Sequence, residues 1–317
     1  MSTKHTAESA QKPSQKNKQF VLSKNVYLAT LIVIFCIVAL YFVNSKTISN
    51  NVQKLNAVEN RWLGLTNPNI YQNGTDFKYN LLSTDSTQYY AKRFGDRLVP
   101  WTTETRQFTV ANTKVSTNRS IQQNSDEEGQ IILFNNQTGQ RVIQFYHPEV
   151  KYERLPNALS LLDKLDPNTY YEMALSFDKS YPYVEAKYML DKDDTEWLWI
   201  DSVSDSLIET KQEQEEIGRI SSFFNGNVFG IPYTKYTGWT APDAYVERLE
   251  SDEIQESIYA DYANSILEEL KANDPDLEGG KFRIIGAVVT GTPDELMKYQ
   301  DMDFIRASSL GASTSIY

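Results

Sequence analysis

The chain has 317 residues, of which 40% are hydrophobic and 12% aromatic. This length and composition give a hydrophobic core large enough for one or two domains, and they exclude a disordered chain and a disulfide-stapled miniprotein. The net charge of −11 argues against a nucleic-acid partner. With two histidines and a single cysteine, Cys36, the chain cannot be a zinc finger, a Cys/His protease or an iron–sulfur protein.

The charge is distributed unevenly along the chain. Residues 1–25 contain five lysines and one acidic residue, a charge of +4, so the remainder carries −15. The same segment is rich in lysine, glutamine and serine and poor in apolar residues, which predicts a disordered basic tail.

Residues 26–43 contain no charged residue. As a helix they would extend about 27 Å, close to the roughly 30 Å thickness of the hydrocarbon layer, with Tyr27 and Tyr41 near the two interfaces. The run is longer than the apolar region of a signal peptide, and no small-residue cleavage site follows it. We therefore predict an uncleaved, single-pass transmembrane helix in the cell membrane. The preceding lysines predict a cytoplasmic N-terminus and an extracytoplasmic C-terminal region.

Residues 44–66 continue the helical pattern as a stalk. Apolar residues recur at steps of three and four, which is the spacing of one helix face: Ile48, Val52, Leu55, Val58 and Trp62. This face either packs on the outer domain of the same chain or pairs with a second copy or another membrane protein. Asn67 and Pro68 end the predicted helix.

Residues 67–150 alternate short extended runs with polar turns, which predicts a β-rich extracytoplasmic region. The expected strands are 76–82, 106–111, 130–134 and 141–146. The last two flank Asn135–Gly139, a sequence typical of a hairpin turn.

Residues 151–317 predict an α+β domain. We expect strands at 170–177, 196–201, 282–290 and 304–310, and short helices at 156–165 and 182–190. A further short helix should begin at the capping box Thr292–Glu295. The chain thus contains two strand–short helix–strand units, which favours a sandwich with helices on one face of the sheet. A longer helix over 251–271 is predicted from an apolar face made of Ile254, Ile258, Tyr262, Ile266, Leu267 and Leu270.

Few residues suggest a catalytic or ligand-binding role. The acidic run Asp191–Glu196 has Glu196 where a calcium loop needs glycine, so we interpret it as an exposed turn. His147 precedes a proline and no Gly-x-Ser-x-Gly motif is present, so this histidine is predicted to be structural. No phosphate-binding glycine loop occurs. The sequence therefore predicts no catalytic, cofactor-binding or metal-binding residues, no cofactor and no enzyme activity.

One loop is rich in aromatic residues, glycine and proline, which favour irregular structure. It covers residues 223–239, and its aromatic residues are Phe223, Phe224, Phe229, Tyr233, Tyr236 and Trp239. The rings either pack onto the sheet or form a contact surface for a peptide, a glycan or a partner protein. We carry the six residues forward as candidate contact residues.

The C-terminal half resembles the C-terminal domain of the sigma factor regulator family, the membrane-bound anti-sigma-type proteins of Firmicutes. The similar stretches span about 153–312 and are Ala174–Asp178, Trp197–Asp201, Gly230–Tyr233, Gly286–Gly291, Asp294–Leu296 and Ile305–Gly311. The membrane helix and the segment after it resemble the N-terminal region of the family. The resemblance implies an extracytoplasmic domain that helps to control an alternative sigma factor, with no catalytic residues.

A standard protein interface needs about 800 Å² from each partner, which a tail of residues 1–25 supplies only by folding on binding. We therefore expect control through another membrane or envelope protein rather than direct capture of the sigma factor. The alternative hypothesis is an envelope glycan- or peptide-binding module, or an envelope enzyme, that uses the aromatic loop with carboxylates such as Asp201 and Asp243.

Overall fold

The computed structural model describes residues 24–80, 83–109, 113–117, 121–126, 129–234, 238–273, 275 and 282–315. Of the predicted basic tail, residues 1–25, residues 1–23 lie outside them and the last two belong to the first helix. The first element, α1 (Lys24–Thr66), includes a stretch that is long and apolar enough to cross a membrane. It ends directly before Asn67 and Pro68, as expected. The chain divides into two compact units, residues 1–46 and 47–317, and the second contains the folded domain.

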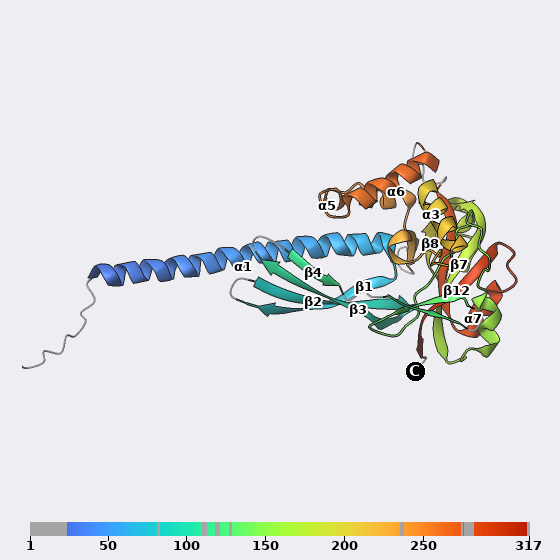
Figure 1. Cartoon of the computed structure of the whole chain (residues 1–317), viewed down its shortest axis with the longest axis horizontal. Coiled ribbons are helices and arrows are strands. Elements are labelled where there is room, and N and C mark those ends of the chain that lie inside the picture. The colour runs from blue at the N-terminus through green and yellow to red at the C-terminus, as the bar shows by residue number, and fades with distance from the viewer. Residues whose placement is uncertain are drawn as a thin grey trace, which may run out of the picture. The chain divides into compact units, whose positions relative to one another are not determined.

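Four antiparallel strands follow α1 and form one sheet in the order β1–β2–β3–β4, which we call the ribbon (Figure 1). They are β1 (Ile70–Tyr79), β2 (Ser83–Phe94), β3 (Arg97–Thr109) and β4 (Thr113–Thr117). A separate pair is formed by β5 (Ile121–Ser125) and β6 (Ile131–Asn135). This region is β-rich, as predicted.

The expected strand at 141–146 is not formed; the segment makes only isolated bridges from Arg141 and Phe145. Side chains satisfy part of its backbone instead, because the hydroxyls of Ser309 and Ser176 accept from the amides of Gln144 and Tyr146 at 2.9 Å each. Such side-chain partners replace the ladder that a regular strand would need.

The second sheet has the strand order β10–β9–β8–β11–β7–β12, and every pairing in it is antiparallel. Its central strands are β7 (Thr169–Pro182), β8 (Thr195–Ile200) and β11 (Arg283–Gly291). The strand β12 (Ile305–Ser315) forms one edge, and β9 (Gly230–Thr234) and β10 (Gly238–Trp239) extend the other. Since β11 lies between β7 and β8, and β7 lies between β11 and β12, the two strand–helix–strand units interleave. This arrangement is that of a split βαβ motif.

The helices within these units are short and share one sheet face. The first unit contains α2 (Tyr183–Ala186) and the second α7 (Pro293–Leu296) followed by η3 (Met297–Tyr299); η1 (Ala158–Lys164) precedes β7. The predicted capping box begins α7, where Thr292 Oγ1 accepts from the Glu295 amide and the Glu295 carboxylate accepts from the Thr292 amide. The prediction of mixed helix and sheet is confirmed. The expectation of helices on one face only is wrong, because Leu207 and Ile208 of α3 (Asp205–Glu216) pack against the core on the other face.

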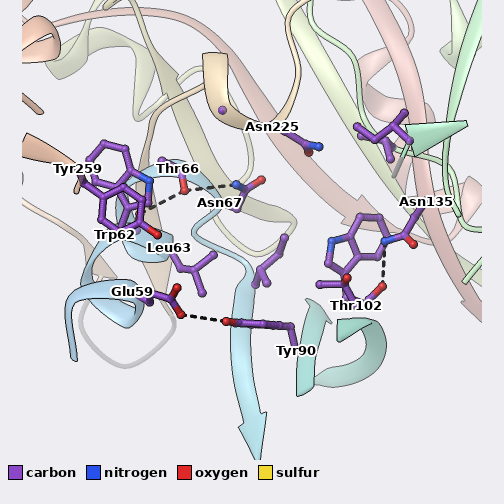
Figure 2. A pocket seen from close by; sticks show the side chains of 15 residues that line it. Glu59, Trp62, Leu63, Thr66, Asn67, Tyr90, Thr102, Asn135, Asn225 and Tyr259 are labelled. Carbon is purple, nitrogen blue, oxygen red and sulfur yellow. Dashed lines mark hydrogen bonds between the residues drawn. The ribbon is translucent and has the colours of Figure 1, made fainter. Parts of the chain in front are cut away.

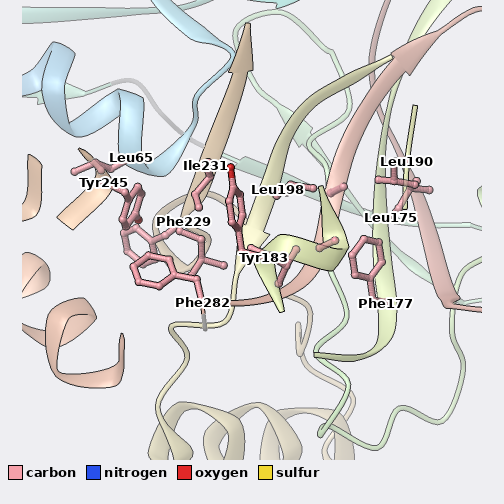
Figure 3. Close-up of a cluster of buried hydrophobic side chains, with 14 of the residues drawn as sticks. Leu65, Leu175, Phe177, Tyr183, Leu190, Leu198, Phe229, Ile231, Tyr245 and Phe282 are labelled. Carbon is pink, nitrogen blue, oxygen red and sulfur yellow. The ribbon is translucent and has the colours of Figure 1, made fainter. Parts of the chain in front are cut away.

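Alternating side chains of the sheet build two cores, and Figure 3 shows side chains of the larger one. On β8, Leu198 and Ile200 enter the larger core beneath the short helices, and Trp197 and Trp199 enter the smaller core on the opposite face. Both faces are therefore covered, which explains why β8 and β11 read as nearly continuous hydrophobic runs rather than alternating ones. The smaller core is closed by residues 143–152 and by α3 (Asp205–Glu216).

The helix expected over 251–271 is interrupted. The structure has α4 (Pro242–Leu249), α5 (Asp252–Gln255) and α6 (Ala260–Asn273), so this prediction is wrong between α5 and α6. The Ser257 hydroxyl donates to the Ile254 carbonyl at 2.7 Å and accepts from the Tyr259 amide at 3.0 Å, which favours a turn over a helix. As a result Ile258 and Tyr262, placed on the buried face by the sequence pattern, are 74% and 62% exposed.

The apolar face of the stalk packs on the folded domain of its own chain. Ile48 and Val52 form a cluster with Phe108 of β3, and Leu55 joins its edge. Further along, Val58 and Trp62 pack against the larger core. Of the two alternatives left open by the sequence, contact within the chain is the one observed over residues 48–62.

Candidate functional site

A cavity of about 190 Å³ lies where the stalk, the ribbon and the C-terminal domain meet (Figure 2). The stalk contributes Glu59, Trp62 and Leu63, the ribbon contributes Tyr90 and Trp101, and Asn225 and Tyr259 come from the C-terminal half. The wall thus combines aromatic rings and aliphatic side chains with amides and one carboxyl group. Any movement of the stalk against the domain changes its shape.

Trp62 is the main aromatic contact of the stalk. Its ring stacks on Tyr259, with centroids 4.7 Å apart and planes 10° from parallel, and meets the edge of Phe229 at 5.9 Å. Phe229 belongs to the larger core. The stalk therefore contacts the core of the C-terminal domain directly, through Trp62 and through Leu65, which is fully buried in that core.

Next to the cavity lies a buried ionic cluster between the stalk and the ribbon. Arg106, which is fully buried, donates from Nη2 to Glu59 and, at 2.6 Å, to Glu104. The Tyr90 hydroxyl lies 3.1 Å from Glu59 and 3.3 Å from Glu104. Two carboxylates thus share one guanidinium. Burial, reinforced by the nearby Glu104 charge, raises the pKa of Glu59 above its usual value, although Arg106 opposes the shift.

Two consecutive residues of β2 attach the ribbon to the six-stranded sheet. Lys92 Nζ lies 2.6 Å from Glu172 of β7, and Arg93 Nη2 lies 3.1 Å from Glu196 of β8. Their side chains leave opposite faces of the strand, as neighbouring residues do. Thr290 of β11 pairs with Glu172 in register and donates its hydroxyl to Glu196 at 3.1 Å. The two acids therefore hold the ribbon at one end of the central strands.

A second cavity of about 400 Å³ opens beside this attachment. Tyr71 and Arg93 of the ribbon line it, with the guanidinium of Arg93 located 5.1 Å from the centre of the Tyr71 ring, and Glu196 and Tyr233 line it from the sheet. Burial raises the pKa of Glu196, against the attraction of Arg93. The cavity is therefore lined by aromatic rings together with positively and negatively charged side chains.

A known protein family matches much of the C-terminal half of the chain. Residues 162–312 match the model described as sigma factor regulator C-terminal. These residues are therefore similar to the C-terminal domain of sigma factor regulators, and we call them the sigma factor regulator domain. The match begins within η1 and ends within β12, so it encloses the complete split βαβ arrangement and the insertion that carries α3 to α6. No curated protein and no solved structure matches the chain.

The sequence stretches that resembled the family occupy the framework of the sigma factor regulator domain. They form most of β8, β9, β11, α7 and β12 and the middle of β7. The resemblance is confirmed, with a start at residue 162 rather than near 153. Because most of these residues are core positions, they fix the fold and do not mark a catalytic centre. The family is regulatory, and together with the apolar helix it supports a membrane-anchored sigma factor regulator.

Of the six aromatic candidates, the four whose side chains the structure describes do not gather at one place. Phe223 is buried in the smaller core, Phe224 lies beside a third cluster near the ribbon, and Phe229 is buried in the larger core. Tyr233 lines the 400 Å³ cavity, in β9, where its backbone pairs with that of Trp239. Tyr236 falls outside the described residues. The loop is also more regular than expected, because Gly230–Thr234 pairs with β8 as a strand.

The other residues singled out in the sequence have structural partners. His147 is buried, 3.2 Å from Asp201 through Nε2, and its ring lies against Trp199 and Phe223. In the acidic turn, Asp191 and Asp194 both lie 2.6 Å from Lys298 Nζ. Within the described ranges no group of three or more His, Cys, Asp or Glu side chains is arranged to hold a metal ion.

Sequence reasoning missed the ionic cluster and the two β2 attachments. One signal was present: Glu59 occurs between Leu55 and Trp62 at helical spacing, so an acid interrupts the apolar face of the stalk. An acid at such a position needs a buried partner. The partner, Arg106, is far away in the sequence, and only the fold brings the two together.

Proposed function

We propose that the chain is a membrane-anchored regulator of an alternative sigma factor. In this proposal residues 26–43 cross the cell membrane, the lysine-rich tail is cytoplasmic, and the sigma factor regulator domain lies outside the cytoplasm. The supporting observation is the presence, in one chain, of this domain and of an uncharged helix of membrane length preceded by a lysine-rich segment.

The regulation is exerted through a second membrane or envelope protein. The tail before the helix is short compared with the surface that a stable interface requires, so it is poorly suited to cover a sigma factor. The folded domain, in contrast, offers contact residues at the margin of the 400 Å³ cavity, among them the candidate Tyr233. The stalk contacts at Trp62 and Glu59 provide the physical connection between a partner bound to the domain and the membrane helix.

The orientation is tested by cysteine labelling of intact cells. Cys36 is first replaced by serine, and then Ser9→Cys or Tyr188→Cys is introduced; Tyr188 is 78% exposed on the domain. A membrane-impermeant maleimide should label the cysteine at position 188 directly and that at position 9 only after permeabilisation. Labelling in the reverse order would place the domain in the cytoplasm and overturn the proposal.

The partner is tested by photo-crosslinking in cells, with the crosslinker at position 233, 188 or 9, together with transcript profiles of a deletion strain. We expect a membrane protein to be captured from position 233 and not from position 188, and the transcripts of one sigma factor to change on deletion. Capture of a sigma factor from position 9 would show direct sequestration instead. Unchanged transcripts would remove the regulatory function.

A further inference from the structure

One end of the ribbon combines exposed aromatic rings with a tether to the membrane helix. Residues opposite one another in neighbouring strands project from the same face of a sheet. At this end the register places Tyr79 of β1 opposite Thr84, Thr84 opposite Phe108, and Phe108 opposite Thr113. Phe108 packs on Ile48 and Val52 of the stalk, so the whole row lies on the face that the stalk covers.

The stalk covers the middle of this row but leaves its edge open. Phe108 is 1% exposed, whereas Tyr79 is 72% and Phe77 is 41% exposed. The rings of Phe77 and Tyr79 stack on one another, with centroids 6.1 Å apart and planes 24° from parallel. The outer strand thus presents a pair of aromatic side chains to its surroundings.

The opposite face of the same end is polar. Lys78 pairs in register with Asp85, Asp85 with Gln107, and Gln107 with Lys114. Gln107 also donates to the Asp85 carboxylate at 3.0 Å. The ribbon end is therefore amphipathic, with aromatic rings on the face of the stalk and charged side chains on the other.

The chain keeps this end close to the end of the uncharged run. Val43 is the last residue of that run and Ile48 the first stalk residue in the Phe108 cluster. Even a fully extended chain between them spans at most about 18 Å. Neighbouring strands are about 4.8 Å apart, so Tyr79 lies only two strand spacings from Phe108. A protein anchored by residues 26–43 therefore holds these rings within reach of the bilayer surface.

We infer that Phe77 and Tyr79 form a membrane-contact site that rests in the headgroup region of the outer leaflet. This inference rests on the proposed anchoring. Aromatic rings, and tyrosine in particular, favour the interface because the ring is apolar and the hydroxyl stays hydrated. The contact fixes the ribbon, and with it the stalk, relative to the bilayer. A partner that moves the domain must then act against this second point of attachment.

The test uses the full-length chain in phosphatidylethanolamine/phosphatidylglycerol vesicles. Cys36 is replaced by serine, and Tyr79→Cys is labelled with the environment-sensitive fluorophore NBD. Lys78→Cys, on the polar face of the same strand, is the matched control. Lipids spin-labelled at the headgroup should quench NBD at position 79 and leave NBD at position 78 bright. Equal fluorescence loss at both positions, or none at position 79, would overturn the inference.

Because labelling removes the Tyr79 ring, a second measurement keeps both rings. NBD is placed at Thr113→Cys, in the same row, with or without the double substitution Phe77→Ser/Tyr79→Ser. We expect quenching by the spin-labelled lipid in the chain with intact rings and its loss in the double variant. A signal that instead changes with the protein-to-lipid ratio and not with the quencher would show contact between two copies and would overturn the inference.

Native Cys36 separates this inference from the proposed function. NBD on Cys36 in the otherwise unchanged chain should be quenched by lipids spin-labelled in the acyl chain. If Cys36 is quenched and positions 79 and 113 are not, the anchor stands and the membrane-contact site is wrong. If Cys36 is not quenched, the anchoring in the proposed function fails as well.

Discussion

Lys92 Nζ lies 2.6 Å from the Glu172 carboxylate, and both side chains are almost completely buried. The pair is embedded in further contacts: Asn69 donates to Glu172 at 2.9 Å, the Ala312 amide donates at 3.2 Å, and the ammonium lies 4.2 Å from the Trp101 ring centre. It joins the ribbon to the central strand of the sigma factor regulator domain. Removing one partner leaves an uncompensated charge in a site from which water is excluded.

We therefore predict that Lys92→Met lowers the free energy of unfolding by about 3–5 kcal/mol. The double variant Lys92→Met/Glu172→Gln should be clearly more stable than Lys92→Met, because no unpaired charge remains. Denaturant titration of the full chain in detergent, followed by tryptophan fluorescence, measures both values. Lys164→Met, at an exposed position of η1, is the control and should change stability little. A double variant as unstable as the single one would show that the ionic attraction is not the cause.

The second prediction concerns pH. Because burial raises the pKa of Glu59 in the folded protein above its ordinary value of 4.5, the folded state binds more protons than the unfolded state between the two pKa values. The stability that comes from protonated Glu59 is fully present below pH 4.5. It is lost as the pH rises through the pKa that Glu59 has in the folded state. Relative to Glu59→Gln, the unsubstituted chain should therefore lose stability with increasing pH over this window.

The measurement is a set of unfolding titrations from acid to neutral pH, with Glu268→Gln as a control on the exposed face of α6. The difference between the unsubstituted chain and Glu59→Gln should change with pH, whereas the difference from Glu268→Gln should stay nearly constant. Parallel pH profiles for the unsubstituted chain and Glu59→Gln would show that Glu59 stays ionised beside Arg106 and that burial does not decide its protonation.

The stalk and the sheet illustrate what the sequence could and could not predict. The apolar face from Ile48 to Trp62 and the break at Pro68 are local patterns, so the helix and its end were predictable. The interruption at Ser257 was not, because an apolar repeat continues through it and the competing hydrogen bonds depend on a single hydroxyl. The interleaved strand order could not be predicted from local sequence either, because it depends on which strands pair across long stretches of chain.

The candidate site likewise combines features that the sequence predicted with features that it could not predict. The aromatic loop was visible by composition, but composition does not show which core each ring enters, and Phe223 and Phe229 enter different ones. Lys92 and Arg93 looked like ordinary strand residues. Their partners, Glu172 and Glu196, lie in another domain region, and only the packing of the ribbon on the sheet makes them ion pairs.

The third prediction concerns Gly286, which lies in β11 between β7 and β8. A Cβ atom at this position would be 2.6 Å from the Leu175 carbonyl oxygen and 3.1 Å from Cε3 of Trp199. Since backbone in the centre of a sheet cannot move easily, we expect Gly286→Ala to lower stability by about 1–3 kcal/mol, the usual cost of overpacking. Gly226→Ala is the matched control, because nothing lies within 4 Å of its added Cβ. Equal melting temperatures for the two variants would contradict the prediction.

The last prediction concerns the coupling of the stalk to the domain through Trp62 and Tyr259. Their stacked geometry, at 4.7 Å and 10°, is that of an aromatic pair whose interaction contributes about 0.5–1.5 kcal/mol beyond the burial of area. A double-mutant cycle with Trp62→Leu and Tyr259→Leu should give a coupling free energy in this range.

A second cycle between Trp62→Leu and Tyr188→Leu is the control, and it should be additive because Tyr188 is exposed and no ring contact links the two residues. If the stalk transmits a signal, Trp62→Leu should also weaken the transcriptional effect of the regulator at an unchanged amount of protein, as measured by reporter activity and immunoblotting. A coupling free energy of zero, with normal signalling in Trp62→Leu, would exclude this ring contact as the mechanical connection between the stalk and the sigma factor regulator domain.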